Sequence, residues 1–114
     1  MNTTLGYFTI DTPDIDRARA FYGALFGWTF DEAASHETYA HVADAGIPFG
    51  FVKGERRDFS HLYFQVDDID ALCVRIADLG GKCAIPAASK SGRSVKASDD
   101  QGVSFSLWEP AGDR

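Results

Sequence analysis

The stretch Tyr7-Phe-Thr-Ile-Asp-Thr-Pro-Asp-Ile-Asp16 returns 54 positions later as His61-Leu-Tyr-Phe-Gln-Val-Asp-Asp-Ile-Asp70. The correspondence continues without a gap to a glycine in each copy, Gly27 and Gly81. Apolar positions of one copy fall on apolar positions of the other. A short domain made of two similar halves is therefore the first conclusion, and the functional question is what fills the cleft between them.

Each copy predicts a strand followed by a helix. The alternation of β-forming residues at the start of each copy indicates the strand. Asp14 and Asp68 then make suitable N-caps, because a carboxylate accepts amide hydrogens of the first helical turn. Apolar residues follow at intervals of three to four, which is typical of an amphipathic helix, and the helices are expected to end at Gly27 and near Gly81.

Three further strands are expected after each helix, at residues 28–30, 38–43, 47–52, 82–85, 94–98 and 103–108. The segment from Ala87 to Gly92 is small and polar, and it is predicted to be a loop. Each half is then βαβββ, so the predicted class is α+β with mixed sheets. We expect one domain, residues 1–114, with modules at 5–53 and 59–110.

Composition limits the possible partners. The chain has 114 residues, 45% of them hydrophobic and 25% charged, which is ordinary for a globular protein. Its net charge of -6 argues against a general nucleic-acid binder, because neutralising phosphates needs clustered Lys and Arg. No apolar run approaches the ~20 residues of a membrane span. The first residues show no basic segment followed by an apolar one, so no signal peptide is expected.

The two cysteines, Cys73 and Cys83, have no metal-type spacing. We expect both to be reduced thiols in the core of a cytoplasmic protein.

The strand faces turned away from the helices mix aromatic and polar side chains: Tyr7, Thr9, His61, Tyr63, Gln65, Ser104, Ser106 and Trp108. A ligand site needs such a mixture of apolar area and a few orienting polar groups. The alternative is a sheet face half exposed to solvent. Because both halves contribute aromatic residues, we favour a cleft that binds a small molecule.

The chain resembles the vicinal oxygen chelate superfamily, which includes glyoxalase I, fosfomycin- and bleomycin-resistance proteins, and extradiol dioxygenases of the dihydroxybiphenyl type. The resemblance covers about residues 5–110. It rests on Asp14 with Phe21-Tyr22 and Leu25-Phe-Gly-Trp28, on Val66-Asp-Asp-Ile-Asp70, on Leu79-Gly-Gly81, and on Asp99-Asp-Gln-Gly102 with Leu107-Trp-Glu109. The Phe-Gly-Trp and Leu-Trp-Glu segments are most similar to a glyoxalase-like branch. Such a resemblance is specific for the fold and weak for function.

The resemblance implies that the two modules curl into facing cups, that metal-dependent members hold one divalent ion with four side chains, and that the chain forms a homodimer. The implied ligand positions are here Tyr7, His61, Ser106 and, within about one residue, Gly50. Glycine has no side chain, and a hydroxyl or un-ionised phenol is a poor ligand beside imidazole and carboxylate. We therefore predict no metal or other cofactor. One divalent metal ion, with help from His41, is the alternative.

The predicted ligand-binding residues are Tyr7, Thr9, Gly50, His61, Tyr63, Ser106 and Trp108, and the candidate catalytic residues are His61 and Tyr7. His61 either contacts a ligand, and could then act as a metal-free general base, or fills space in its cup. The aromatic rings either stack on a flat ligand or pack within the cup. The cations at positions 90, 93 and 96 either meet an anionic group or form a solvated charge run.

The leading hypothesis is a glyoxalase-like, small-molecule-binding protein with a degraded metal site, similar to resistance proteins that sequester their ligand. The acidic chain would suit a cationic ligand. The alternative is a lyase or isomerase of the glyoxalase type, metal-dependent or metal-free, that uses His61. A structural or regulatory dimer with an empty cleft is a third possibility, so the sequence leaves enzymatic activity open.

Overall fold

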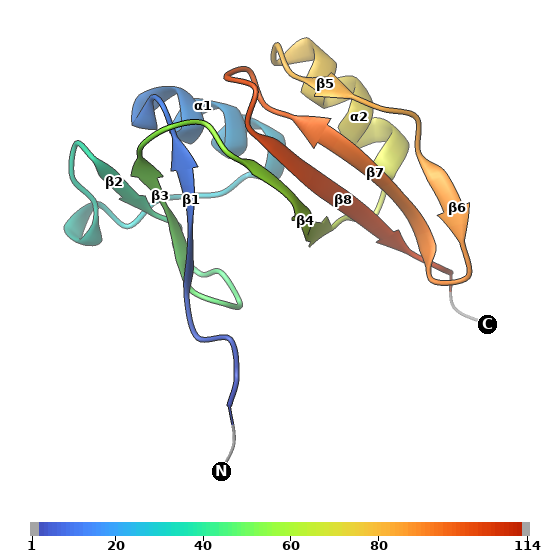
Figure 1. The fold of residues 1–114 in the computed structure, drawn as a ribbon, viewed down its shortest axis with the longest axis horizontal. Coiled ribbons are helices and arrows are strands. Elements are labelled where there is room, and N and C mark those ends of the chain that lie inside the picture. The colour runs from blue at the N-terminus through green and yellow to red at the C-terminus, as the bar shows by residue number, and fades with distance from the viewer. Residues whose placement is uncertain (1–2, 113–114) are drawn as a thin grey trace. The chain divides into compact units, whose positions relative to one another are not determined.

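The chain is described in a computed structural model over residues 3–112. It divides into two compact units, the first up to Arg56 and the second from Arg57 onwards. The first unit contains β1 (Phe8–Thr12), α1 (Ile15–Phe26), the short 3-10 helix η1 (Glu32–Ala34), β2 (Tyr39–His41) and β3 (Phe49–Lys53) (Figure 1). The second contains β4 (Asp58–Gln65), α2 (Ile69–Asp78), β5 (Lys82–Cys83), β6 (Ala87–Ser89), β7 (Gly92–Ser98) and β8 (Ser104–Pro110).

Each unit has one helix and a mixed sheet, which confirms the predicted α+β class. In the first unit β3 is central, with β1 parallel on one side and β2 antiparallel on the other. In the second unit the order is β4-β8-β7-β5, and β6 pairs with β7 beside β5. β4 and β8 are parallel, as β1 and β3 are, so the internal repeat extends to the pairing of the strands.

Both helices begin where the sequence predicts. The Asp14 carboxylate accepts a hydrogen bond from the Arg17 amide at 3.1 Å, and Asp68 does the same for Ala71 at 3.1 Å. Each bond satisfies an amide that has no partner within its helix, and such a cap contributes about 1 kcal/mol. α1 ends at Gly27, which adopts the left-handed conformation with φ 73°.

One face of each sheet packs against its helix and forms the core. Tyr22 of α1 lies against Phe51 of β3, with ring centroids 4.9 Å apart, and both side chains are almost fully buried. In the second unit Ile69 and Ile76 of α2 are fully buried, as is Leu107 of β8. Burying a side chain of this size contributes about 1.5–3 kcal/mol. The open faces of both sheets are left for other contacts.

The expected strand at residues 28–30 is wrong. Phe30 makes only an isolated bridge with Val42. Trp28 instead packs among aromatic rings, with its centroid 4.8 Å from Phe26 and 5.1 Å from Phe49. Packing of aromatic rings therefore holds this segment in place. A composition rich in β-forming residues does not show whether a segment is held by ring packing or by strand pairing.

The expected loop at residues 87–92 is also wrong in part. Ala87–Ser89 forms strand β6, which pairs antiparallel with the start of β7. Small residues have low strand propensity, and here the neighbouring strand imposes the conformation.

The prediction of two reduced cysteines is wrong. Cys73 of α2 and Cys83 of β5 form a disulfide, with Cα atoms 5.6 Å apart. The turn at 79–81 reverses the chain between the helix and the short strand, so two residues ten positions apart meet. The spacing alone does not reveal this turn-mediated contact.

Within residues 3–112, the helices are all too short or too polar to cross a lipid bilayer.

Gly92, the first residue of β7, allows a test of the close approach of β7 to β8. Its φ is +135°, and an added Cβ would meet the Glu109 carbonyl oxygen and lie 2.6 Å from the Ala111 nitrogen. We expect Gly92→Ala to lower the free energy of unfolding by about 2–4 kcal/mol, because the side chain strains the backbone and collides with it. Urea denaturation measures the change. Gly46→Ala, with open space around the site, is the control and should cost under about 0.5 kcal/mol; equal effects would contradict this account.

Candidate functional site

The strand registers show which positions of the two units are equivalent. Thr9 pairs with Gly50 between β1 and β3. Tyr63, which lies 54 positions after Thr9, pairs with Ser106 between β4 and β8. Gly50 and Ser106 therefore hold the same place on the open faces of their respective sheets.

The open face of the second sheet carries two adjacent rows of side chains. Residues paired across strands share a face, so the rows follow from the registers: Tyr63, Ser106 and Lys96 in one, and Gln65, Trp108 and Ser94 in the next. The residues between these rows, such as Leu107, are buried on the helix side. The predicted alternation along β4 and β8 is thus observed.

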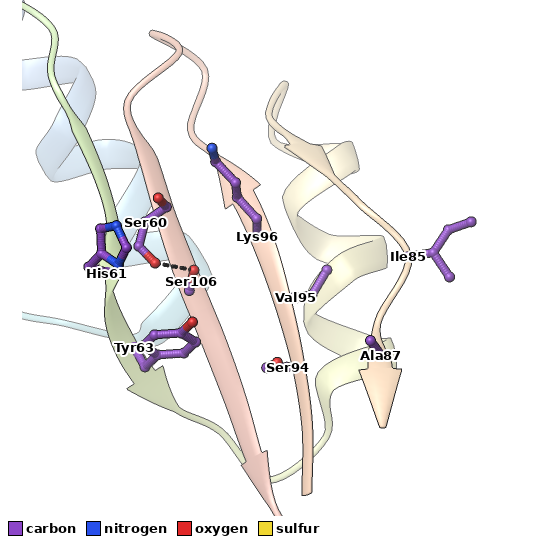
Figure 2. A pocket seen from close by; sticks show the side chains of 9 residues that line it. All are labelled: Ser60, His61, Tyr63, Ile85, Ala87, Ser94, Val95, Lys96 and Ser106. Carbon is purple, nitrogen blue, oxygen red and sulfur yellow. Dashed lines mark hydrogen bonds between the residues drawn. The ribbon is translucent and has the colours of Figure 1, made fainter. Parts of the chain in front are cut away.

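This face contains a hollow of about 300 Å³, drawn in Figure 2, which we call the second-unit hollow. Its lining comes from β4, β8, β7, β6 and the connection before β6: Ser60, His61, Tyr63, Ser106, Ser94, Val95, Lys96, Ala87 and Ile85. The structure thus brings three of the predicted site residues together, His61, Tyr63 and Ser106. Apolar area and hydroxyl groups lie side by side there, as in a site for a small organic molecule.

Lys96 is the one cation that lines the second-unit hollow. Its ammonium lies 3.6 Å from the Asp58 carboxylate. Hydrogen bonds from Ser60 lower the pKa of Asp58, and the positive charge of Lys96 lowers it further. Asp58 is therefore ionised at neutral pH and partly offsets the charge of Lys96.

β4 departs from regular pairing at the hollow. Phe59 pairs with Phe105 and Tyr63 with Ser106, so residues 60–62 bulge out of the ladder. The Ser106 hydroxyl donates a 2.6 Å hydrogen bond to the Ser60 carbonyl and closes the gap, shown as a dashed line in Figure 2. Ser106 is only 3% exposed. Its single proton is committed to the backbone.

His61 lies on this bulge and is exposed. Among residues 3–112, no side chain donates to or accepts from its ring, so nothing described orients the imidazole. Tyr63 is 57% exposed beside it. Trp108 shares the face but not the hollow lining, because its indole nitrogen donates to the Ser91 carbonyl at 3.2 Å.

The first sheet carries a different group on its open face. Thr9, Gly50 and His41 pair in one row across β1, β3 and β2, and Thr9 is exposed there. The Tyr39 ring lies directly over Gly50. A Cβ added to Gly50 would be 2.6 Å from Tyr39 Cε1, from Tyr39 Oη and from the Ala40 carbonyl oxygen. No side chain larger than glycine fits at position 50 while Tyr39 stays in place.

Tyr39 also joins Tyr7 to His41, and we call these three residues the phenol–imidazole chain. Its hydroxyl is hydrogen-bonded to the Tyr7 hydroxyl and lies 2.6 Å from His41 Nδ1. The Tyr7 and His41 rings are parallel within 7°, with centroids 6.1 Å apart. Burial, the hydrogen bond to Tyr7 and the nearness of the Tyr7 phenol together raise the pKa of Tyr39 to about 12. Tyr39 is therefore a neutral phenol at physiological pH.

The sequence alone did not assign a role to Tyr39. The signal was the alternating pair of ring-bearing residues, at positions 39 and 41. For Ser60, Ile85 and Ala87 of the second-unit hollow there was no comparable signal, because hydroxyl and small apolar side chains are common on any surface.

The four positions implied for a family-type metal site can be tested for donors. They offer the Tyr7 phenol, no side chain at Gly50, the His61 imidazole, and the Ser106 hydroxyl, which is bonded to backbone. Across residues 3–112, no three His, Cys, Asp or Glu side chains gather where they could hold a metal ion. A divalent ion needs about three or four good donors, so these positions do not fit one.

Comparisons with known proteins agree on one family. A family model described as a glyoxalase-like domain matches residues 7–108. CFP32 of Mycobacterium tuberculosis, named as a candidate glyoxylase, is 29% identical over an alignment of 119 positions. The alignment covers 93% of this chain and 45% of that protein. A protein of the same name from Mycobacterium bovis matches equally. The chain thus spans about half the length of the curated relatives it matches.

Solved structures show the same fold. The fosfomycin resistance protein FosX of Listeria monocytogenes has a TM-score of 0.76 at 22% identity, covering 97% of this chain and 96% of FosX. TnmS3, an antibiotic binding protein of a Streptomyces species, has a TM-score of 0.71 at 24% identity, covering 96% and 98%. A glyoxalase/bleomycin resistance protein/dioxygenase family enzyme of Burkholderia phytofirmans reaches 0.77 at 21%, covering 96% and 100%.

Tyr39 allows a test of the phenol–imidazole chain by pH titration. Tyr39 should ionise near pH 12, and ultraviolet titration of Tyr39→Phe should show a late step that is smaller by the share of one tyrosine. The folded protein binds the Tyr39 proton more tightly than the unfolded chain does, whose tyrosine pKa is about 10. The free energy of unfolding should therefore fall as pH rises from about 10 to about 12, and fall less in Tyr39→Phe. A late step of undiminished amplitude in Tyr39→Phe would contradict the assignment.

Proposed function

Because the chain belongs to the glyoxalase-like domain family of the vicinal oxygen chelate superfamily, we propose that it binds a small organic molecule without the help of a metal ion. One observation carries the proposal: the Tyr39 ring occupies the space over Gly50. A metal-binding side chain at that position would have to displace Tyr39 and break its bonds to Tyr7 and His41. The first unit therefore offers phenols and an imidazole where a metal site would need a carboxylate.

The second-unit hollow supports a ligand with a flat, partly apolar body. Its volume of about 300 Å³ is at the lower end of the range for small-molecule sites. The exposed rings of Tyr63 and His61 can stack on such a body, and Ser94 can hydrogen-bond a polar substituent. Thr9, Gly50 and Tyr7 in the first unit, and Trp108 in the second, are further residues that we place in ligand binding.

Sequestration of the resistance type is the role that we propose for this binding. Among proteins of the same fold, TnmS3 is an antibiotic binding protein and FosX a fosfomycin resistance protein. The net charge of -6 favours approach of a cationic ligand, and the ion pair between Lys96 and Asp58 reduces the one positive charge in the hollow.

A lyase or isomerase that uses His61 has less support. A general base needs an oriented ring within reach of the proton that it takes, and no side chain among residues 3–112 holds the His61 imidazole. The donor set at the implied metal positions likewise gives a metal-dependent enzyme no basis.

Location in the cytoplasm stays a prediction. The disulfide between Cys73 and Cys83 speaks against it, because reducing compartments keep such thiols free.

We further propose a homodimer. β4 is an eight-residue strand at one edge of its sheet, and β1 lies at the edge of the other. Unpaired edges favour pairing with a second copy. Sedimentation equilibrium should therefore give a mass near 25 kDa, about twice the 12.4 kDa of the chain. A mass that stays at 12.4 kDa at high protein concentration would refute the dimer.

Thermal denaturation with a ligand panel tests the binding proposal. The panel holds flat aromatic compounds that are cationic, neutral or anionic, and the divalent ions Zn, Ni, Mn, Fe and Co. We expect at least one organic compound to raise the Tm by several degrees, since a ligand at about 100 times its Kd adds about 2.7 kcal/mol. The metal ions should leave the Tm unchanged.

Two variants locate the binding. Tyr63→Ala should abolish the ligand-induced rise, because it removes the exposed ring of the second-unit hollow. Val74→Ala is the matched control, since Val74 is 63% exposed on α2 and lies outside the hollow. A panel in which only a metal ion raises the Tm, and in which His61→Ala removes that effect, would replace the proposal with a metal-dependent enzyme.

A further inference from the structure

The two contacts of the phenol–imidazole chain can be hydrogen bonds in either direction. Tyr39 has a single hydroxyl proton, and it faces two partners, the Tyr7 oxygen and His41 Nδ1 at 2.6 Å. If Tyr39 donates to His41, then Tyr7 donates to Tyr39 and keeps a free lone pair. If His41 donates from Nδ1, then Tyr39 donates to Tyr7, whose proton points outward. Both arrangements use every contact, so the direction of donation can reverse.

The two ends of this chain differ in exposure. Tyr7 is 46% exposed, so a ligand can approach its side chain. His41 is only partly exposed, and its position is held through the backbone: its amide donates to Ser35 Oγ at 3.0 Å, and its carbonyl accepts from the Asp31 amide at 2.9 Å. The Tyr39 ring is fixed over Gly50. The phenol–imidazole chain therefore has an accessible phenol, Tyr7, at one end and a base held in place, His41, at the other.

We propose that Tyr7, Tyr39 and His41 form a proton relay, in which Tyr7 takes the proton of a weakly acidic hydroxyl, a phenol or an enol, and His41 is the terminal base. This activity lies in the first unit and goes beyond the binding proposed for the second-unit hollow. Tyr7 contacts the ligand, whereas Tyr39 and His41 act on the ligand only through Tyr7.

The transfer conserves protons and charge. The O–H bond of the ligand breaks, and its proton bonds to Tyr7 Oη. The former Tyr7 proton moves to Tyr39 Oη, and the former Tyr39 proton moves to His41 Nδ1. The ligand is left as its anion and His41 as an imidazolium ion. The high pKa of Tyr39 fits this role, because Tyr39 passes a proton on without remaining ionised.

The probe is 3-nitrophenol, added to the full chain at about pH 7.4, where about a tenth of the free dye is ionised and an imidazole of ordinary pKa is mostly neutral. Visible absorbance measures nitrophenolate, and equilibrium dialysis measures bound dye. A new positive charge near the bound dye should lower its pKa by about one unit, which corresponds to about fivefold more nitrophenolate. His41→Gln and Tyr39→Phe should return the ionised fraction of bound dye to that of free dye.

His36→Gln is the matched control. It removes an imidazole of the same segment whose Nδ1 contacts the Thr38 hydroxyl. The two hydrogen bonds between His36 and Tyr39 are backbone bonds that the substitution leaves in place, so the variant should keep the fivefold rise. The nitrogen NMR spectrum of the wild-type protein gives a second readout that needs no variant: His41 Nδ1 should be unprotonated in the free protein and gain a proton when the dye binds.

The outcomes separate this inference from the proposed function. The relay is overturned if His41→Gln retains the rise, if His41 Nδ1 stays unprotonated with dye bound, or if no dye binds. Dye binding that Tyr63→Ala abolishes and His41→Gln leaves untouched would place the dye in the second-unit hollow, which would overturn the relay and support the binding proposal.

Discussion

A β-strand sends alternate side chains to opposite faces of its sheet, and in each unit one of those faces is occupied by a helix. Phe51 of the first sheet and Leu107 of the second are buried there. Most polar side chains of the strands therefore lie on the other face, with Thr12 and the disulfide-bonded Cys83 as exceptions. The candidate site residues lie on the two open sheet faces, because the helices cover the opposite faces.

The two open faces have equivalent strand positions but different side chains at them. At one such position the first unit has Gly50, covered by Tyr39, and the second has Ser106, bonded to the Ser60 carbonyl. In both units, the residue at this position contacts groups of its own unit. A ring fills the first and a bulged strand the second, so neither presents a side chain that is free to bind a metal.

Much of the fold could be predicted from the sequence, because it depends on local signals. Asp14, Asp68 and Gly27 mark helix ends by their own hydrogen-bonding and backbone preferences, and the 54-residue repeat predicts that the second half copies the first. The disulfide, the Ala87–Ser89 strand and the aromatic packing of Trp28 depend on neighbours that are distant in sequence or beyond a turn. Local patterns carry no information on such contacts.

The candidate site was predicted less completely than the fold. Tyr7, His61, Tyr63 and Ser106 lie on the open faces, as the alternation of strand residues requires. The contact of Tyr39 with Tyr7 and Gly50 depends on the register between β1, β3 and β2, which a single sequence does not specify. The bulge at residues 60–62 likewise arises from pairing with β8, so the orientation of His61 could not be inferred.

The Tyr39 ring over Gly50 also limits how this chain can change over generations. A carboxylate at position 50 would collide with the ring and with the Ala40 carbonyl oxygen, so that substitution alone destabilises the protein before any metal can bind. Replacing Tyr39 first would break the bonds to Tyr7 and His41 and leave glycine below an empty space. The clash of a new side chain with the Ala40 carbonyl oxygen would also remain, so each step toward a metal site at this position is unfavourable. Tyr39 and the Ala40 carbonyl oxygen together keep position 50 a glycine, so this sheet face cannot gain a carboxylate there by one substitution.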